Sequence, residues 1–271
     1  MPTKTCFQRL PKRDRDEVVR LDAHYSSPPP ETMLAEGLRR VRDMARNSPK
    51  GSSLPLALAG EFFGLMSRIQ EGGIIRRLRD DNVAPLRTSV NTAARLQLLT
   101  IVAGGKEWSS SSDCGHVFAM IRALAVDDWP LINAFVSRFP GPFSDGHPAT
   151  VLFANALYGV LRDDRAALEH LDTRIRQRKE SSFFQAMSDT LVGIMGDDAA
   201  SVAASIGTLI KYNRRQDQMG IVFFNMEKLI CLMGHGLFNL CRRKFSARGL
   251  SVPEIAAELT WDAEFQRSVE A

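Results

Sequence analysis

Apolar residues recur at intervals of three and four along most of this chain, which is the spacing of one face of an α-helix. In the first half, this pattern predicts helices at 14–25, 31–47, 54–70 and 86–103. The sequence has no strictly alternating runs rich in β-branched residues, the pattern typical of strands. We therefore predict an all-α fold.

Glycine pairs and a serine run mark the expected ends of these helices. Gly72-Gly73 and Gly104-Gly105 follow the third and fourth helices, and glycine favours helix ends. The serine-rich stretch at 109–113 is typical of a loop. We place a boundary there, between an N-terminal helical segment at 1–113 and an array of helical hairpins at 114–271. The two parts are expected to form one continuous compact unit.

Four segments of the second half repeat one pattern, in which an apolar helix meets a short break before a second helix. They are 119–128, 155–164, 189–198 and 227–236. The first three end in Asp-Asp, and Asp127, Asp163 and Asp197 are 36 and 34 residues apart. A period near 35 is typical of stacked antiparallel helical hairpins, as in TPR-like α-solenoids, and such stacks mostly bind other macromolecules. In the fourth copy, 234–236 is Gly-His-Gly, so we expect the array to end there.

Each Asp pair lies where one predicted helix ends and the next begins. A carboxylate there accepts a hydrogen bond from an exposed N–H of the second helix. The far ends of the second helices are basic: Arg174, Arg176, Arg178 and Lys179; Lys211, Arg214 and Arg215; Arg242, Arg243 and Lys244. Both features suit the helix dipole, and stacking predicts an acidic edge opposite a basic edge.

Two interpretations of the acidic edge stay open: helix capping and solubility, or a surface that meets a charged partner. For the second, we predict an aromatic anchor beside the carboxylates. The candidate partner-binding residues are Asp127, Asp128, Trp129, Asp163, Asp164, Asp197 and Asp198.

Overall charge and composition narrow the class of partner. The chain has 35 basic and 31 acidic residues, a mild net charge of +4. Its basic stretches at 39–42, 74–79 and 174–179 lack interleaved aromatics, so we expect no nucleic-acid partner. The four cysteines are scattered, as in a reduced cytoplasmic protein. No signal-peptide core is present, and the most apolar run, 54–66, is short and contains Glu61, so we expect no membrane partner.

Motifs for catalysis or cofactor binding are missing. The Cys and His residues near 114–116 and 231–241 do not form a zinc-binding spacing. Cys231 lies in an apolar run, which favours a role in the core. The serine run near His116 has no nucleophile elbow, and the glycine pairs do not form a phosphate-binding loop. We therefore predict no enzymatic activity, no catalytic or metal-binding residue and no cofactor.

The second half resembles the bacterial immunity-protein family numbered 49. The resemblance covers roughly 114–260 and is carried by the helix order and by the stretches 123–129, 159–164, 192–198 and 245–250. The family implies a cytosolic antidote that neutralises one cognate toxin, from polymorphic or type VI secretion systems, by direct binding. It supplies no catalytic residues. Many antidotes to nucleases are acidic, and the pI near 9.0 of this chain departs from that pattern and leaves the class of toxin open.

The leading hypothesis is therefore a cytoplasmic immunity protein that binds a secreted antibacterial effector toxin. A helical-repeat adaptor or chaperone of a secretion system is the alternative, and a nucleic-acid-binding regulator is a weaker one.

Overall fold

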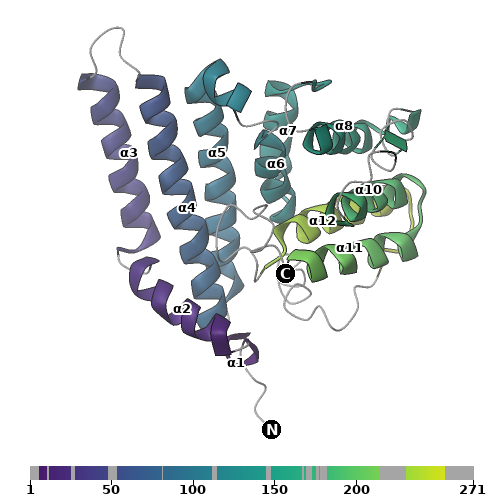
Figure 1. Ribbon diagram of the computed structural model, residues 1–271, viewed down its shortest axis with the longest axis horizontal. Helices are drawn as coiled ribbons and strands as arrows, with labels where there is room; N and C mark the ends of the chain where they lie inside the picture. Colours follow the sequence, from purple (N-terminus) through teal and green to yellow (C-terminus); the bar gives the residue numbers. More distant parts are fainter. Residues whose placement is uncertain are drawn as a thin grey trace.

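The computed structural model is built from helices (Figure 1). It describes residues 6–10, 12–25, 28–47, 54–80, 82–111, 115–144, 148–166, 168, 173–174, 177, 182–213 and 230–253. Every secondary-structure element in these residues is an α-helix, which confirms the all-α class. None of the described helices combines the length and apolar character that crossing a membrane requires.

The N-terminal part is a layer of long helices. They are α1 (Cys6–Arg9), α2 (Lys12–Tyr25), α3 (Pro30–Asn47), α4 (Leu54–Asp80) and α5 (Val83–Ser111). Figure 1 shows α3, α4 and α5 side by side, with α1 and α2 across their lower ends. Buried Met33 of α3, Ile69 of α4 and Leu96 of α5 belong to one apolar cluster, which holds the three helices together.

Two of the predicted helix ends are wrong. α4 continues through Gly72-Gly73 to Asp80, and α5 continues through Gly104-Gly105 and the first serines to Ser111. At Gly73 the reason is close packing, because a Cβ there would lie 2.3 Å from the Cβ of Ser89 in α5. The loop predicted at 109–113 is thus helical as far as Ser111, and residues 112–114 lie outside the described part.

The second part contains shorter helices. They are α6 (Gly115–Ala125), α7 (Trp129–Arg138), α8 (Pro148–Arg162), α10 (Ser182–Met195), α11 (Ala199–Asn213) and α12 (Leu232–Ala247). Helix α6 stands beside α5, whereas α8, α10, α11 and α12 run across the direction of the long helices (Figure 1). In the hairpin of α10 and α11, Gly193 brings the helices so close that a Cβ would lie 2.9 Å from Cγ2 of Val202.

Helix α12 packs on α6 at the start of the array. The amide of Asn239 donates to the carbonyls of Leu124 and Ala125, at 2.9 and 3.0 Å. Gly236 touches α6 directly, because a Cβ there would lie 2.6 Å from the carbonyl oxygen of Ile121. Helix α12 therefore contacts α6, which belongs to the first Asp-Asp repeat. In a linear solenoid, the last helix would pack only against the repeat before it.

The break predicted in the fourth copy is also wrong. Residues 234–236 lie inside α12, and His235 is buried in that helix. The reason is local, because Cys231 caps the helix just before these residues: its Sγ accepts a hydrogen bond from the Gly234 N–H at 3.3 Å. Residues 227–229 of this copy, and the terminal helix predicted at 255–259, lie outside the described residues.

Buried clusters join the two predicted parts of the chain. The largest gathers side chains of α6, α7, α8, α10, α11 and α12, and includes Ala94 of α5. A second combines Val18 and Ile74 of the N-terminal helices with Val126 and Ile230. The division at 113/114 stays a prediction. The shared clusters place α5 next to the first Asp-Asp junction.

Candidate functional site

The three Asp-Asp pairs adopt one backbone conformation. The first residue of each pair has a positive φ, of 58°, 57° and 58° for Asp127, Asp163 and Asp197. In the first junction, the Asp128 N–H donates to the Ala123 carbonyl at 2.9 Å and the Asp127 N–H donates to the Leu124 carbonyl at 3.0 Å. These two bonds form the Schellman motif that ends a helix. Aspartate is one of the few non-glycine residues that adopt this left-handed conformation readily.

The second residue of each pair starts the next helix. Oδ1 of Asp128 accepts a hydrogen bond from the Leu131 N–H at 3.0 Å and caps α7. Asp198 accepts from the Ser201 N–H at 3.0 Å and from its hydroxyl at 2.6 Å, and these bonds lower the pKa of Asp198. The capping interpretation is confirmed for these two residues. Asp164 occupies the equivalent position and is exposed.

Asp128 also ties the first junction to α5. Its Oδ2 accepts from Nδ2 of Asn91 at 2.7 Å and from Nη2 of Arg95 at 2.6 Å. Partial burial opposes ionisation of Asp128, but the hydrogen bonds from Asn91, Leu131 and Arg95 outweigh it and lower the pKa. Asn91 and Arg95 were not among the predicted site residues, although their spacing of four places both on one face of α5.

The first Asp of each pair faces the basic residues of α12 and the turn that follows it. Arg242 lies 3.2 Å from Asp127, and Lys244 lies 2.8 Å from Asp163. Arg248 reaches Asp163 at 2.9 Å and Asp197 at 2.5 Å. The expectation that the acidic and basic edges lie on opposite sides is therefore wrong for this basic run, because α12 crosses the ends of all three hairpins.

We call this surface the junction face. It comprises Asp127, Trp129, Asp163, Asp197, Arg242, Arg243, Lys244 and Arg248. Asp128, Asp164 and Asp198 do not belong to it. The spacing of four between Lys244 and Arg248 is the sequence signal that places both cations on the same side.

The cations of the junction face also bind carbonyls at helix ends. Nζ of Lys244 donates to the Leu161 carbonyl of α8 at 3.2 Å, and Nη1 of Arg248 donates to the Ile194 carbonyl of α10 at 3.0 Å. Carbonyls at a helix C-terminus lack partners within the helix and carry partial negative charge. The hydrogen bond from Lys244 is the main reason that the pKa of Asp163 is lowered. The carboxylate of Asp163 is therefore charged at neutral pH.

Trp129 borders a pocket on the junction face. Its indole N–H donates to Oδ1 of Asp127 at 2.7 Å, and the guanidinium of Arg243 lies 3.9 Å from the centre of its ring. The pocket has a volume of about 410 Å³ and is also lined by Asn133, Leu161 and Asp163. Arg243 is exposed, and no described carboxylate forms an ion pair with it. The pocket thus combines a cation, an aromatic surface and an amide.

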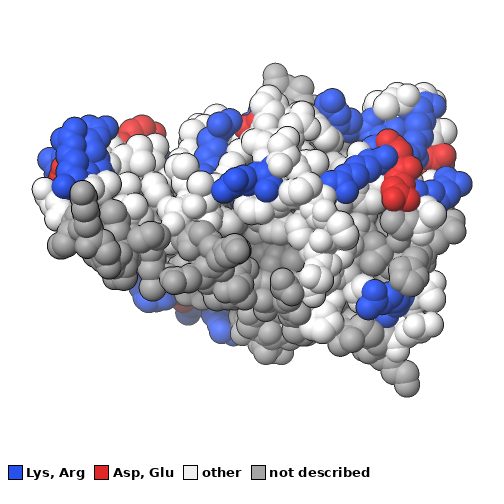
Figure 2. Space-filling view, turned by 90° about the horizontal axis from the view of Figure 1, so that it is seen from above, with Lys and Arg blue, Asp and Glu red and all other residues white. Residues whose placement is uncertain are grey.

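Charge on the upper face of the molecule is mixed. Figure 2 shows its largest group of acidic side chains near the right-hand end, with basic side chains around it, and smaller acidic groups beside basic ones farther left. Of the basic residues predicted at the ends of second helices, Arg174 and Lys211 are exposed. Arg176, Arg178, Lys179, Arg214 and Arg215 lie outside the described residues.

The histidine and cysteines that were considered for catalysis or metal binding are buried in the core where the structure describes their side chains. His116 is buried and stacks on Phe139, with ring centres 4.6 Å apart, and burial lowers its pKa to about 4. Cys231 is buried, which confirms its predicted place in the core, and burial raises the pKa of Cys241 to about 12. A neutral thiol with so high a pKa is a poor nucleophile. Cys114 lies outside the described residues.

Comparison with known protein families, with curated proteins and with solved structures finds no match for this chain. The resemblance to immunity-protein family 49 and the predicted partner contacts therefore stay predictions. Function is inferred from the residues of the chain itself.

Proposed function

We propose that this chain is an immunity protein, without enzymatic activity, that binds and neutralises a cognate secreted antibacterial toxin in the cytoplasm. In this proposal its hairpins stack in a TPR-like manner and the junction face meets the toxin. The observation that carries the proposal is the pocket in which exposed Arg243 lies over Trp129. Arginine and tryptophan are the residues that most often dominate the binding energy of protein interfaces.

Hydrogen bonds and ion pairs fix the side chains of the junction face, which favours binding. Asp127 is held by the backbone of its turn, by Trp129 and by Arg242, and Asp163 is held by Lys244 and Arg248. Side chains that are already fixed lose little conformational entropy when a partner binds. A rigid surface of this kind supports recognition of a single cognate protein.

The charges of the pocket define the partner. Lys244 and Arg248 already share the carboxylate of Asp163, whereas Arg243 forms no ion pair with a described residue and is the pocket cation that we assign to the partner. We infer that the toxin contributes an Asp or Glu side chain to Arg243 and an apolar group to the free part of the Trp129 ring. The side chain of Asp163 is 59% exposed and accepts hydrogen bonds from the rim of the toxin.

Co-expression with the toxin encoded beside this chain tests the proposal. The wild-type protein is expected to restore bacterial growth and to co-purify with the toxin. Arg243→Glu is expected to weaken binding about 30-fold or more, because it replaces the cation by a repelling carboxylate. Arg138→Glu is the matched control, since Arg138 is exposed at the end of α7 and outside the pocket.

Each result has a clear meaning. If the wild-type protein neither rescues growth nor co-purifies, the immunity proposal is wrong. Co-purification without rescue supports the adaptor or chaperone, for which stacked hairpins are equally suited. DNA binding that weakens steeply with salt would instead support the nucleic-acid-binding regulator. Equal binding by Arg243→Glu and the wild-type protein would remove the pocket from the interface.

A further inference from the structure

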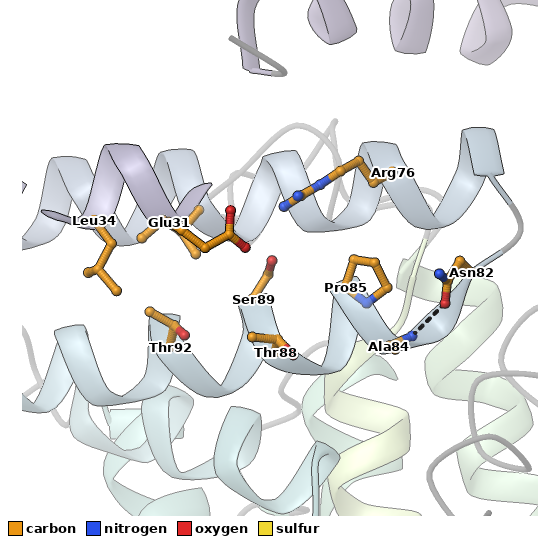
Figure 3. A pocket seen from close by; sticks show the side chains of 10 residues that line it. Glu31, Leu34, Arg76, Asn82, Ala84, Pro85, Thr88, Ser89 and Thr92 are labelled. Carbon is orange, nitrogen blue, oxygen red and sulfur yellow. Dashed lines mark hydrogen bonds between the residues drawn. The ribbon is translucent and has the colours of Figure 1, made fainter. Parts of the chain in front are cut away.

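A second pocket lies in the N-terminal layer, far in the chain from the junction face. The first turn of α3 covers the groove between α4 and α5 there, and the space measures about 360 Å³. Figure 3 shows Glu31 of α3 and Arg76 of α4 extending over this space from different helices, with Thr88, Ser89 and Thr92 of α5 below them. The volume is within the range of natural small-molecule sites, roughly 300–1,000 Å³.

The groove has a fixed floor. Ser89 is buried, and its Cβ fills the position that a side chain at Gly73 would occupy, so α4 and α5 are in direct contact below the pocket. Ile69 is 2% exposed and closes one side. The hydroxyl-bearing residues Thr88 and Ser89 precede Thr92 by four and three positions along α5, so each of them neighbours Thr92 on the helix surface, and all three line the pocket. The pocket is therefore built by helix packing.

Arg76 is positioned by its own helix. Its Nε donates to the Gly72 carbonyl at 3.2 Å, and Nη1 and Nη2 make no hydrogen bond with a described residue. These two nitrogens are the ones that form a forked pair of bonds to a carboxylate. Figure 3 shows the guanidinium directed into the pocket, toward the side of Glu31 and Ser89.

Glu31 supplies the opposite charge. Among the described residues it forms neither an ion pair nor a hydrogen bond, and it does not pair with Arg76 across the pocket. A lone anion in the pocket would be repelled by Glu31, and a lone cation would be repelled by Arg76. The arrangement favours a molecule that carries both charges a short distance apart.

We propose that this pocket binds a free α-amino acid. Its carboxylate accepts a forked pair of hydrogen bonds from Arg76, and its ammonium group donates to the carboxylate of Glu31. The hydroxyls of α5 complete the hydrogen bonds of these groups, and Ile69 and Leu34 contact the aliphatic part of the ligand. Because the ligand bridges α3 to α4, its binding fixes α3 on the long helical pair. This site does not depend on the proposed binding of a toxin.

Isothermal titration calorimetry of the full chain with the standard amino acids, one at a time at millimolar concentration, tests the proposal. At least one is expected to bind, and the same amino acid is expected to raise the melting temperature. Its N-acetyl derivative lacks the ammonium group, and its amide lacks the carboxylate. Each derivative is expected to bind about tenfold or more weakly, since each loses a charged hydrogen bond. These measurements use the unaltered protein, so no folding defect affects them.

Variants then assign the contacts. Arg76→Gln and Glu31→Gln are each expected to weaken binding about tenfold or more. The controls are Arg46→Gln and Glu36→Gln, which alter exposed residues of α3 outside the pocket and are expected to bind as the wild-type protein does. Absence of binding by every amino acid overturns the proposal, and so does binding of the N-acetyl and amide derivatives with the affinity of the parent amino acid. Unchanged affinity in both pocket variants also overturns it.

Discussion

Nη2 of Arg248 lies 2.9 Å from Oδ1 of Asp163, although 85 residues separate the two in the chain. The same guanidinium donates to Asp197 and to the Ile194 carbonyl. One arginine therefore joins the Asp-Asp turns at 163–164 and 197–198 to the end of α12. This connection lies on the junction face, where it is only partly exposed to solvent.

Replacing Arg248 tests the strength of that connection. Arg248→Gln removes the ion pairs with both carboxylates, so we expect the free energy of unfolding to fall by about 1–2 kcal/mol. Arg243→Gln is the control, because Arg243 contacts the Trp129 ring but pairs with no described carboxylate, and we expect a loss of about 0.5 kcal/mol. Urea denaturation measures both values. Equal losses in the two variants would mean that the Arg248 ion pairs add nothing to stability.

The left-handed conformation of Asp163 makes a second prediction. Asp163→Asn keeps a side chain that tolerates positive φ but removes the charge that Lys244 and Arg248 bind. Asp163→Ala removes the charge and also strains the backbone, by about 1–2 kcal/mol. We therefore expect the alanine variant to be less stable than the asparagine variant by about 1 kcal/mol in urea denaturation. Variants of equal stability would show that the turn relaxes away from positive φ.

Gly73 and Gly60 lie in the same helix and are expected to respond in opposite ways. A Cβ at Gly73 would overlap Ser89, so Gly73→Ala is expected to lower the free energy of unfolding by about 1–3 kcal/mol. At Gly60 nothing described lies within 4 Å of an added Cβ, and Gly60→Ala is expected to stabilise α4 by about 0.5–1 kcal/mol. Thermal unfolding distinguishes the two. The double variant Gly73→Ala with Ser89→Gly is expected to regain part of the loss, and no recovery would contradict direct contact as the cause.

His116 predicts a dependence of stability on pH. In the unfolded chain it takes up a proton near pH 6.5, whereas burial lowers its pKa to about 4 in the folded protein. The unfolded chain therefore binds more protons between these values, and the free energy of unfolding falls as the pH falls from 6.5 to 4. The loss amounts to roughly 3 kcal/mol at most.

His116→Phe tests this origin, because it keeps a ring against Phe139 and Phe143 but removes the titrating group. Urea denaturation from pH 7 to pH 4 is expected to show a shallower decline for the variant than for the wild-type protein. Near pH 8 the histidine is neutral in both the folded and the unfolded state, so the free energy of unfolding is expected to change with pH equally in the variant and the wild-type protein. Parallel curves over the whole range would exclude His116 as the source.

The junctions were predictable because they depend on neighbouring residues. An Asp pair after an apolar helix supplies one residue for the left-handed turn and one cap for the next helix, so Asp128 and Asp198 were correctly expected to cap. The same local reasoning failed at Gly73. Glycine favours both helix ends and close helix contacts, and only the position of Ser89 on another helix distinguishes the two.

Contacts between distant segments account for the rest of the difference. The basic run at 242–244 was expected opposite the acidic edge, because the repeat predicts that each helix packs on its neighbour. Gly236 and Asn239 instead place α12 on α6, which brings Arg242 to Asp127. Periodicity describes the face that a helix buries, but it does not specify the helix that covers that face.

The position of α12 has a consequence for synthesis of the chain on the ribosome. Helices α6 to α11 emerge first, and until α12 follows, Asp127, Asp163 and Asp197 lack Arg242, Lys244 and Arg248 and the facing side of α6 is uncovered. The ion pairs that join the three Asp-Asp turns to α12 thus form only after residue 248 has left the ribosome. Ribosome-bound chains in which α12 is still inside the exit tunnel are expected to be cleaved rapidly by protease, whereas chains lengthened by a C-terminal linker that carries residue 253 out of the tunnel are expected to resist it.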